Sequence, residues 1–170
     1  MHWVFGFTRK LLELGAGICG DVRSRATQPG AVEIALWFHD SIYDLRGKDN
    51  EQRSAEWAER AIGHAGADDA LRQRVRELIM ATRHEVVPCE KDEQLLVDVD
   101  LAILGAAPER FEEYGRQVRA EYSWVPGFIY RSKRKEILKS FLARESIYGT
   151  DQFKARYEAQ ARANLARATA

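Results

Sequence analysis

The sequence predicts an all-α fold, and three observations support this prediction. Apolar residues recur at spacings of three and four, the period of an amphipathic helix. No segment alternates between apolar and polar residues over the length of a strand, and no Asn-Gly hairpin turn occurs. The 170 residues suit one hydrophobic core. We therefore expect a single-domain helical bundle over residues 1–170.

Two helices are expected before residue 69. The first begins near Pro29, a favourable first-turn residue, and runs to about Tyr43. A polar turn separates it from the second, where Asp49 and Gln52 have the spacing of a capping box.

A third helix is expected from Asp69 to a point before Pro88, which places His84 at or just past its C-terminus. Its apolar stripe consists of Leu71, Val75, Leu78, Ile79 and Thr82. The remaining helices are expected from about Asp92 to Gly105 and after Pro108, Pro126 and Thr150.

The composition excludes several classes of protein. The 26 basic and 26 acidic side chains give a formal net charge of zero, so no overall field attracts nucleic acid or anionic lipid, although local patches are compatible with this balance. Cys19 and Cys89 form neither a disulfide framework nor a structural zinc motif. No segment approaches the roughly 20 apolar residues of a membrane span. We expect a cytoplasmic protein without a membrane partner.

Two groups of polar residues interrupt apolar helices. His39 and Asp40 end the first helix, where one metal ion could accept an imidazole nitrogen and a carboxylate oxygen. The alternative is an ordinary His-Asp hydrogen bond at a helix end. Asp44, one turn later, would act as a general base or simply end the helix.

The second group is the pair Asp98 and Asp100. They lie about 200° apart on a helix, so only one of them can face a buried site. Asp100 lies on the side of Ile103 and Leu104, and a buried carboxylate there needs a partner. We expect Asp100 to share a metal with the His-Asp pair, and Asp98 to face solvent or to support the site indirectly.

A series of segments resembles the HD-domain superfamily, specifically its small predicted metal-dependent phosphohydrolases. In order, the segments are ALWFHDSIYD, DNEQRSAEWA, LIMATRHE, LLVDVDLAILGA, EYSW and RKEILKSFLARESIYGT, covering roughly residues 28–168. The resemblance implies an all-helical fold in which one histidine, the His-Asp pair and a later aspartate bind a divalent metal. His39 and Asp40 match the pair, and Asp100 matches the later aspartate.

The chain departs from the family's pattern at two places. The N-terminal segment 1–27 is divergent and lacks the Tyr-His-x-x-x-His motif that carries the family's first metal histidine. His2 is the one imidazole there; it either replaces that metal histidine or is simply a surface terminal residue. Asn50-Glu51 also stands where related enzymes often carry His-Glu.

The resemblance implies further roles for Glu51 and His84. Glu51 would orient water or support a ligand, and His84 would contact phosphate. The alternatives are an acid favoured by the helix dipole and a cation at a helix C-terminus. The basic run Arg131, Lys133, Arg134 and Lys135 is interpreted as a solvated helix face, and Trp37, Trp57 and Trp124 as core or interface residues.

These observations lead to one principal functional hypothesis. The chain is expected to be a phosphohydrolase that acts on a small phosphate ester, with a nucleotide as one candidate, through water activated by a divalent metal. Oxygen and nitrogen ligands would admit Mn, Fe, Mg, Ni or Zn. The alternative is a catalytically impaired HD-fold protein that binds a nucleotide or a protein partner; a homo-oligomer is compatible with either.

Overall fold

The structure is a computed structural model that describes residues 24–170. Helices dominate this part of the chain and no strand occurs in it, which confirms the all-α prediction. Contacts divide the chain into two compact units, one ending at Val99 and the other running from Asp100 to Ala170, and each is described by itself. The expectation of one domain over residues 1–170 stays a prediction.

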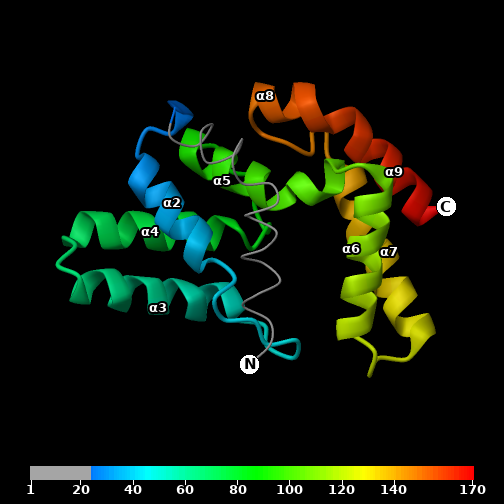
Figure 1. Cartoon of the computed structure of the whole chain (residues 1–170), viewed down its shortest axis with the longest axis horizontal. Coiled ribbons are helices and arrows are strands. Elements are labelled where there is room, and N and C mark those ends of the chain that lie inside the picture. Colours follow the sequence, from blue (N-terminus) through cyan, green and yellow to red (C-terminus); the bar gives the residue numbers. More distant parts are fainter. Residues whose placement is uncertain (1–23) are drawn as a thin grey trace. The chain divides into compact units, whose positions relative to one another are not determined.

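The first unit packs three helices against one another. They are α2 (Pro29–Phe38), α3 (Asn50–His64) and α4 (Asp69–Ala81), and Figure 1 shows α3 and α4 running alongside each other. Each helix turns a stripe of small or branched apolar residues inward. The fully buried members are Val32, Ala35, Ala55, Ala58, Val75, Leu78 and Ile79. Small alanines on α2 and α3 allow the helix backbones to approach closely.

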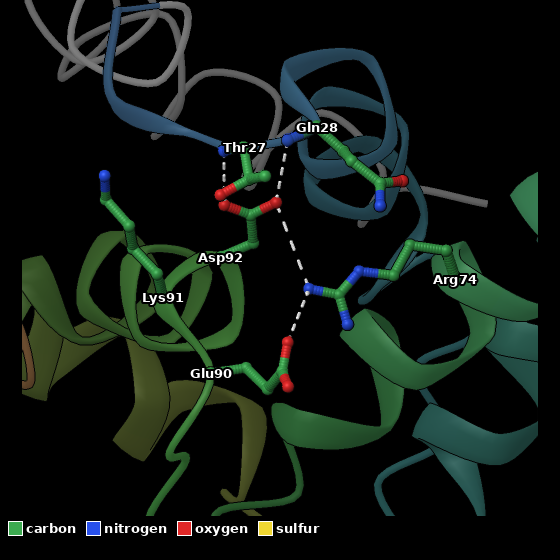
Figure 2. A pocket seen from close by; sticks show the side chains of 6 residues that line it. All are labelled: Thr27, Gln28, Arg74, Glu90, Lys91 and Asp92. Carbon is green, nitrogen blue, oxygen red and sulfur yellow. Dashed lines mark hydrogen bonds and ion pairs between the residues drawn. The ribbon is translucent and has the colours of Figure 1, made fainter.

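The start of α2 is held by a side chain from a distant helix, α5 (Lys91–Leu101). The carboxylate of Asp92, which is 2% exposed, accepts hydrogen bonds from the backbone amides of Thr27 (2.7 Å) and Gln28 (2.9 Å). Figure 2 shows this carboxylate beside the guanidinium of Arg74, which lies 3.9 Å away. Asp92 therefore stabilises the helix start, where unpaired amides would be costly.

A small pocket lies at this helix start, lined by Thr27, Gln28, Arg74, Glu90, Lys91 and Asp92. Within it, Arg74 lies close to several carboxylates. Its guanidinium lies within 4 Å of carboxylate oxygens of Glu77, Glu90 and Glu93 as well as of Asp92. Burial raises the pKa of Glu93, and the charge of Arg74 acts in the opposite direction. Opposite charges thus line the pocket, which lies at the helix start rather than at the predicted metal ligands.

Two details of the expected helices are wrong. Helix α2 ends at Phe38 instead of about Tyr43, because the amide of Ile42 bonds to the side chain of Ser54 and not to a helical carbonyl. The capping box is also absent, since Asp49 makes no side-chain cap bond and Gln52 bonds to Glu56. The first departure involves a tertiary hydrogen bond to another helix and the second a local bond within α3, and residue spacing alone reveals neither.

The second unit begins with a 3₁₀ turn and ends with an interrupted helix. Its elements are η1 (Ala102–Gly105), α6 (Pro108–Glu121), α7 (Gly127–Leu142), α8 (Asp151–Phe153), the π-helical segment η2 (Lys154–Glu158) and α9 (Ala159–Thr169). Helix α9 packs against both η1 and α7. The expected helices after Pro108, Pro126 and Thr150 are therefore present.

Buried polar groups hold the irregular backbone of this unit. The amide of Asn164 donates to the carbonyls of Leu104 and Ala106, both at 2.9 Å. The hydroxyl of Tyr148, a residue only 1% exposed, donates to the carbonyl of Leu101. These bonds satisfy carbonyls at the end of η1 and of α5 that helical pairing leaves open.

The tryptophans with described side chains are exposed, so the expectation of core residues is wrong and that of interface residues stays a prediction. Trp37 is 61%, Trp57 44% and Trp124 53% exposed. Their residue type favours burial, but the inward stripes of their helices are filled by smaller apolar side chains. Among the described helices, none combines the length and apolar character needed to cross a bilayer.

We predict that Asp92→Asn lowers the free energy of unfolding by about 2 kcal/mol, because the buried side chain then offers one acceptor oxygen to two backbone donors and loses the charge that faces Arg74. Urea unfolding measures this loss. Asp69→Asn removes the same charge from a side chain that is 97% exposed, and should change stability by no more than about 0.5 kcal/mol. Equal losses in the two variants would contradict the role of Asp92.

We also predict that Gly105→Ala destabilises the protein by about 2 kcal/mol or more. An added Cβ would lie 2.6 Å from the Cβ and 2.8 Å from the carbonyl oxygen of Tyr157, and backbone cannot easily yield. Gly115→Ala is the matched control, because its Cβ would enter open space on a helix, where alanine is favoured. Thermal unfolding should show a lower midpoint only for the first variant.

Candidate metal centre

His39 is the most deeply buried residue of the predicted ligand set. It directly follows α2 with helical backbone angles and is 2% exposed. Its Nδ1 atom lies 2.9 Å from the carbonyl oxygen of Leu36. Because a carbonyl only accepts, Nδ1 carries the proton in this contact and the lone pair of the neutral ring is on Nε2. The helix end thus selects the ring atom that a metal would bind.

Asp40 connects this buried imidazole with the surface. One of its carboxylate oxygens lies 3.6 Å from Nε2 of His39, and its side chain is 35% exposed. The distance exceeds that of a hydrogen bond but suits two atoms that face a common point. Asp40 therefore leaves one side of the centre accessible to water.

Asp100 is carried on the last turn of α5, the helix in which the two units meet in sequence. His39, Asp40 and Asp100 each offer one ligand atom, and these three atoms all lie within 4.8 Å of one another. Ligands about 2.0 to 2.3 Å from one ion are separated by at most about twice that distance. The 4.8 Å bound lies just above this limit of about 4.6 Å, so a small side-chain adjustment would let the three donors hold a single divalent ion.

The expectation that Asp98 faces solvent is wrong. Asp98 is 1% exposed, whereas Asp100 is half-buried. Residues 95–99 and 101–105 are all buried, so this stretch lacks the solvent-facing stripe that an ordinary amphipathic helix has at every turn. The other expectation for Asp98, an indirect supporting role, stays a prediction.

Asp44 lies outside the cluster, in the exposed loop after α2. Its carboxylate accepts a bond from the amide of Arg46, and its backbone pairs with the side chain of Asn50 through two bonds of 2.9 Å. Asn50 therefore braces this loop at the position where the resembled family often carries a histidine. The bonds give Asp44 a structural role, and its exposure leaves the carboxylate open to solvent.

Glu51 and His84 are not members of the cluster either. Glu51 is half-buried in the first turn of α3, where the helix dipole favours its negative charge. His84 lies three residues beyond α4 and has a φ of 57°, a left-handed conformation that is uncommon outside glycine. The roles in catalysis assigned to both residues stay predictions.

Ser54 is a positioning residue that the sequence did not single out. It is fully buried on α3, and its hydroxyl oxygen accepts a 2.9 Å bond from the amide of Ile42. This contact fixes the chain two residues after Asp40. A serine on the buried stripe of an otherwise apolar helix face was the available signal, because a buried hydroxyl requires a partner.

Comparisons with protein-family models, with curated proteins and with solved structures found no match to this chain. The resemblance to the HD-domain phosphohydrolases therefore stays an expectation from the sequence. His2, the candidate for the family's first metal histidine, and Cys19 lie outside the described residues.

We predict that Ser54→Ala lowers the free energy of unfolding by about 1 to 2 kcal/mol and speeds amide exchange at Ile42, because the half-buried amide of Ile42 loses its acceptor. Urea unfolding and hydrogen exchange measure the two effects. Ser140→Ala, on the exposed face of α7, provides the matched control and should leave both unchanged within error. Unaltered exchange at Ile42 in the first variant would contradict the positioning role.

Proposed function

We propose that this protein is a metal-dependent phosphohydrolase that hydrolyses a small phosphate ester. The observation that carries the proposal is the cluster of His39, Asp40 and Asp100, in which an adjacent His-Asp pair and a distant aspartate place three donor atoms within 4.8 Å of one another. The cluster supports metal binding, and the resemblance of the sequence to HD-domain phosphohydrolases adds the reaction class.

The donor set fits a divalent cation. Two carboxylates bring two negative charges to the imidazole, which matches the charge of the ion. The carbonyl of Leu36 orients the ring and leaves Nε2 as the donor, an arrangement typical of metal-bound histidine. Mixed nitrogen and oxygen donors suit Mn, Fe, Mg, Ni or Zn, and disfavour ions that prefer sulfur.

A divalent ion held by these residues would supply Lewis acidity, lowering the pKa of a water and offsetting the charge of a phosphoryl oxygen. The protein's own contribution is positional. His39 anchors the centre from the buried side, while Asp40 and Asp100 are half-buried and border solvent. Three protein donors leave room for water and phosphate on the accessible side.

Proton transfer and phosphate binding would use residues around the centre. Asp44 and Glu51 are the candidates to accept the proton of the attacking water, and the exposed carboxylate of Asp44 can do so without desolvation. Arg83 and His84 are the candidates to contact phosphate. Arg83 now pairs with Glu85 at 2.8 Å, so substrate binding would exchange one carboxylate partner for a phosphate.

A second candidate is an HD-like protein that binds a nucleotide or protein partner without catalysis. The observation that favours it is the use of Asn50 as a loop brace at a position where the resembled family often places a histidine. Binding of metal without hydrolysis would favour this alternative.

The proposal predicts that chelator-treated full-length protein binds Mn²⁺ in calorimetry and that added Mn²⁺ stimulates hydrolysis of phosphate esters. Asp40→Asn and Asp100→Asn should each weaken Mn²⁺ binding by about tenfold or more, since each removes a ligand charge. Asp69→Asn removes an exposed carboxylate from α4 and should leave the affinity unchanged. The activity assay uses p-nitrophenyl phosphate and a panel of nucleoside monophosphates as substrates.

Circular dichroism of each variant separates loss of the site from loss of the fold. Folded variants that bind Mn²⁺ as tightly as the parent would contradict the ligand assignment. The assays are repeated with Mn, Fe, Mg, Ni and Zn. If the parent binds Mn²⁺ but hydrolyses none of the esters with any of these metals, the binding alternative replaces the enzyme hypothesis.

A further inference from the structure

The connection between α6 and α7 carries an exposed apolar tip. Within six residues of the sequence, Trp124 is 53%, Phe128 70% and Ile129 42% exposed. Together these three residues are called the apolar tip. Figure 1 shows the connection at the end of α7 that lies away from α8. Single exposed apolar side chains are common on protein surfaces, whereas a group of large ones can mark a contact site.

The apolar tip belongs to an ordered connection. The guanidinium of Arg119 donates to the carbonyls of Tyr122 and Val125 and lies over the ring of Tyr130. The ring of Tyr122 contacts both Trp124 and Tyr130. The tip is therefore presented by a braced turn, so little ordering entropy is lost when a partner binds.

The two helices that carry the tip bury very little of their own surface. Phe111 is the one buried residue of α6, and Leu138 the one buried residue of α7. The apolar tip therefore belongs to two helices that bury few side chains of their own.

Basic side chains are frequent in the sequence that contains the tip. Residues 116–139 contain seven basic side chains and two acidic ones, a net charge of +5 in a chain whose formal net charge is zero. The basic residues are Arg116, Arg119, Arg131, Lys133, Arg134, Lys135 and Lys139. Two of them lie beside the tip, since a Cβ added to Gly127 would be 3.3 Å from Nη1 of Arg131 and 3.9 Å from Nη2 of Arg119, whereas Lys135 bonds to the carbonyl of Ala170.

The geometry points to an anionic lipid surface as the partner of this tip. Tryptophan and phenylalanine enter the boundary between headgroups and acyl chains, and flanking cations contact anionic headgroups. A second copy fits less well, because the arginines beside one apolar tip would repel those beside the other. A nucleic acid would satisfy the cations but offers no apolar layer to Phe128 and Ile129. This contact is peripheral and requires no membrane-spanning helix.

The test is flotation of the full-length protein with vesicles. We expect binding to phosphatidylcholine vesicles that contain about 30 mol % phosphatidylglycerol, and at least tenfold weaker binding to phosphatidylcholine alone. Raising sodium chloride from about 0.1 M to about 0.5 M should release the protein from the anionic vesicles, because the cations are screened. Equal binding to both vesicle types, or no binding to either, would overturn the proposal.

Matched variants locate the contact. Trp124→Ser with Phe128→Ser, and Arg131→Gln with Lys133→Gln, should each reduce binding to the anionic vesicles by about tenfold or more. The apolar control is Val86→Ser with Val87→Ser, at side chains 77% and 62% exposed, and the charge control is Arg53→Gln with Arg60→Gln on the exposed face of α3. Both controls should bind as the parent does.

Circular dichroism shows whether each variant is folded, and light scattering reports its oligomeric state. Folded tip variants that retain parental binding would overturn the proposal. A parent that does not bind vesicles but forms dimers, which the tip substitutions dissociate, would also overturn it and assign the tip to a second copy of the chain.

Discussion

The buried carboxylate of Asp92 is the constraint on which the candidate metal centre depends. By accepting hydrogen bonds from the amides of Thr27 and Gln28, it fixes the start of α2 against α5. The hydroxyl of Ser54 fixes the chain just after the other end of α2. A helix held at both ends presents its last residues at a defined place, which is what a metal site requires. Helix α5 carries both Asp92, which holds the start of α2, and Asp100, which is a candidate metal ligand.

The residues in and around this centre differ in solvent exposure, and their exposure indicates what each can do. His39 is nearly inaccessible and its ring is oriented by a backbone carbonyl, so it is suited to hold an ion rather than to exchange protons with solvent. Asp40 and Asp100 are half-buried and border the accessible side. Asp44 is exposed, with its backbone braced by Asn50. The arrangement separates rigid support from groups that can meet a substrate.

In the second unit, polar side chains stabilise backbone that regular helices do not satisfy. Asn164 and Tyr148 bond to carbonyls around η1, and the carboxylate of Glu158 accepts from the amides of Ile147 and Tyr148. This network lies around η1 and η2 and leaves the α6–α7 connection with little burial. The same unit therefore contains a tightly specified interior and an apolar, positively charged end that is available to a partner.

The sequence by itself determined the helical class and most helix positions, because a period of three to four residues and prolines such as Pro29 and Pro108 act locally. It also singled out His39, Asp40 and Asp100 as polar interruptions of apolar helices. Tertiary structure alone decided that α2 ends at Phe38, that Asp98 is buried and that Trp124 is exposed. The reason is physical: periodicity identifies one apolar face, whereas burial of the other faces depends on distant segments that compete for the same surface and hydrogen bonds.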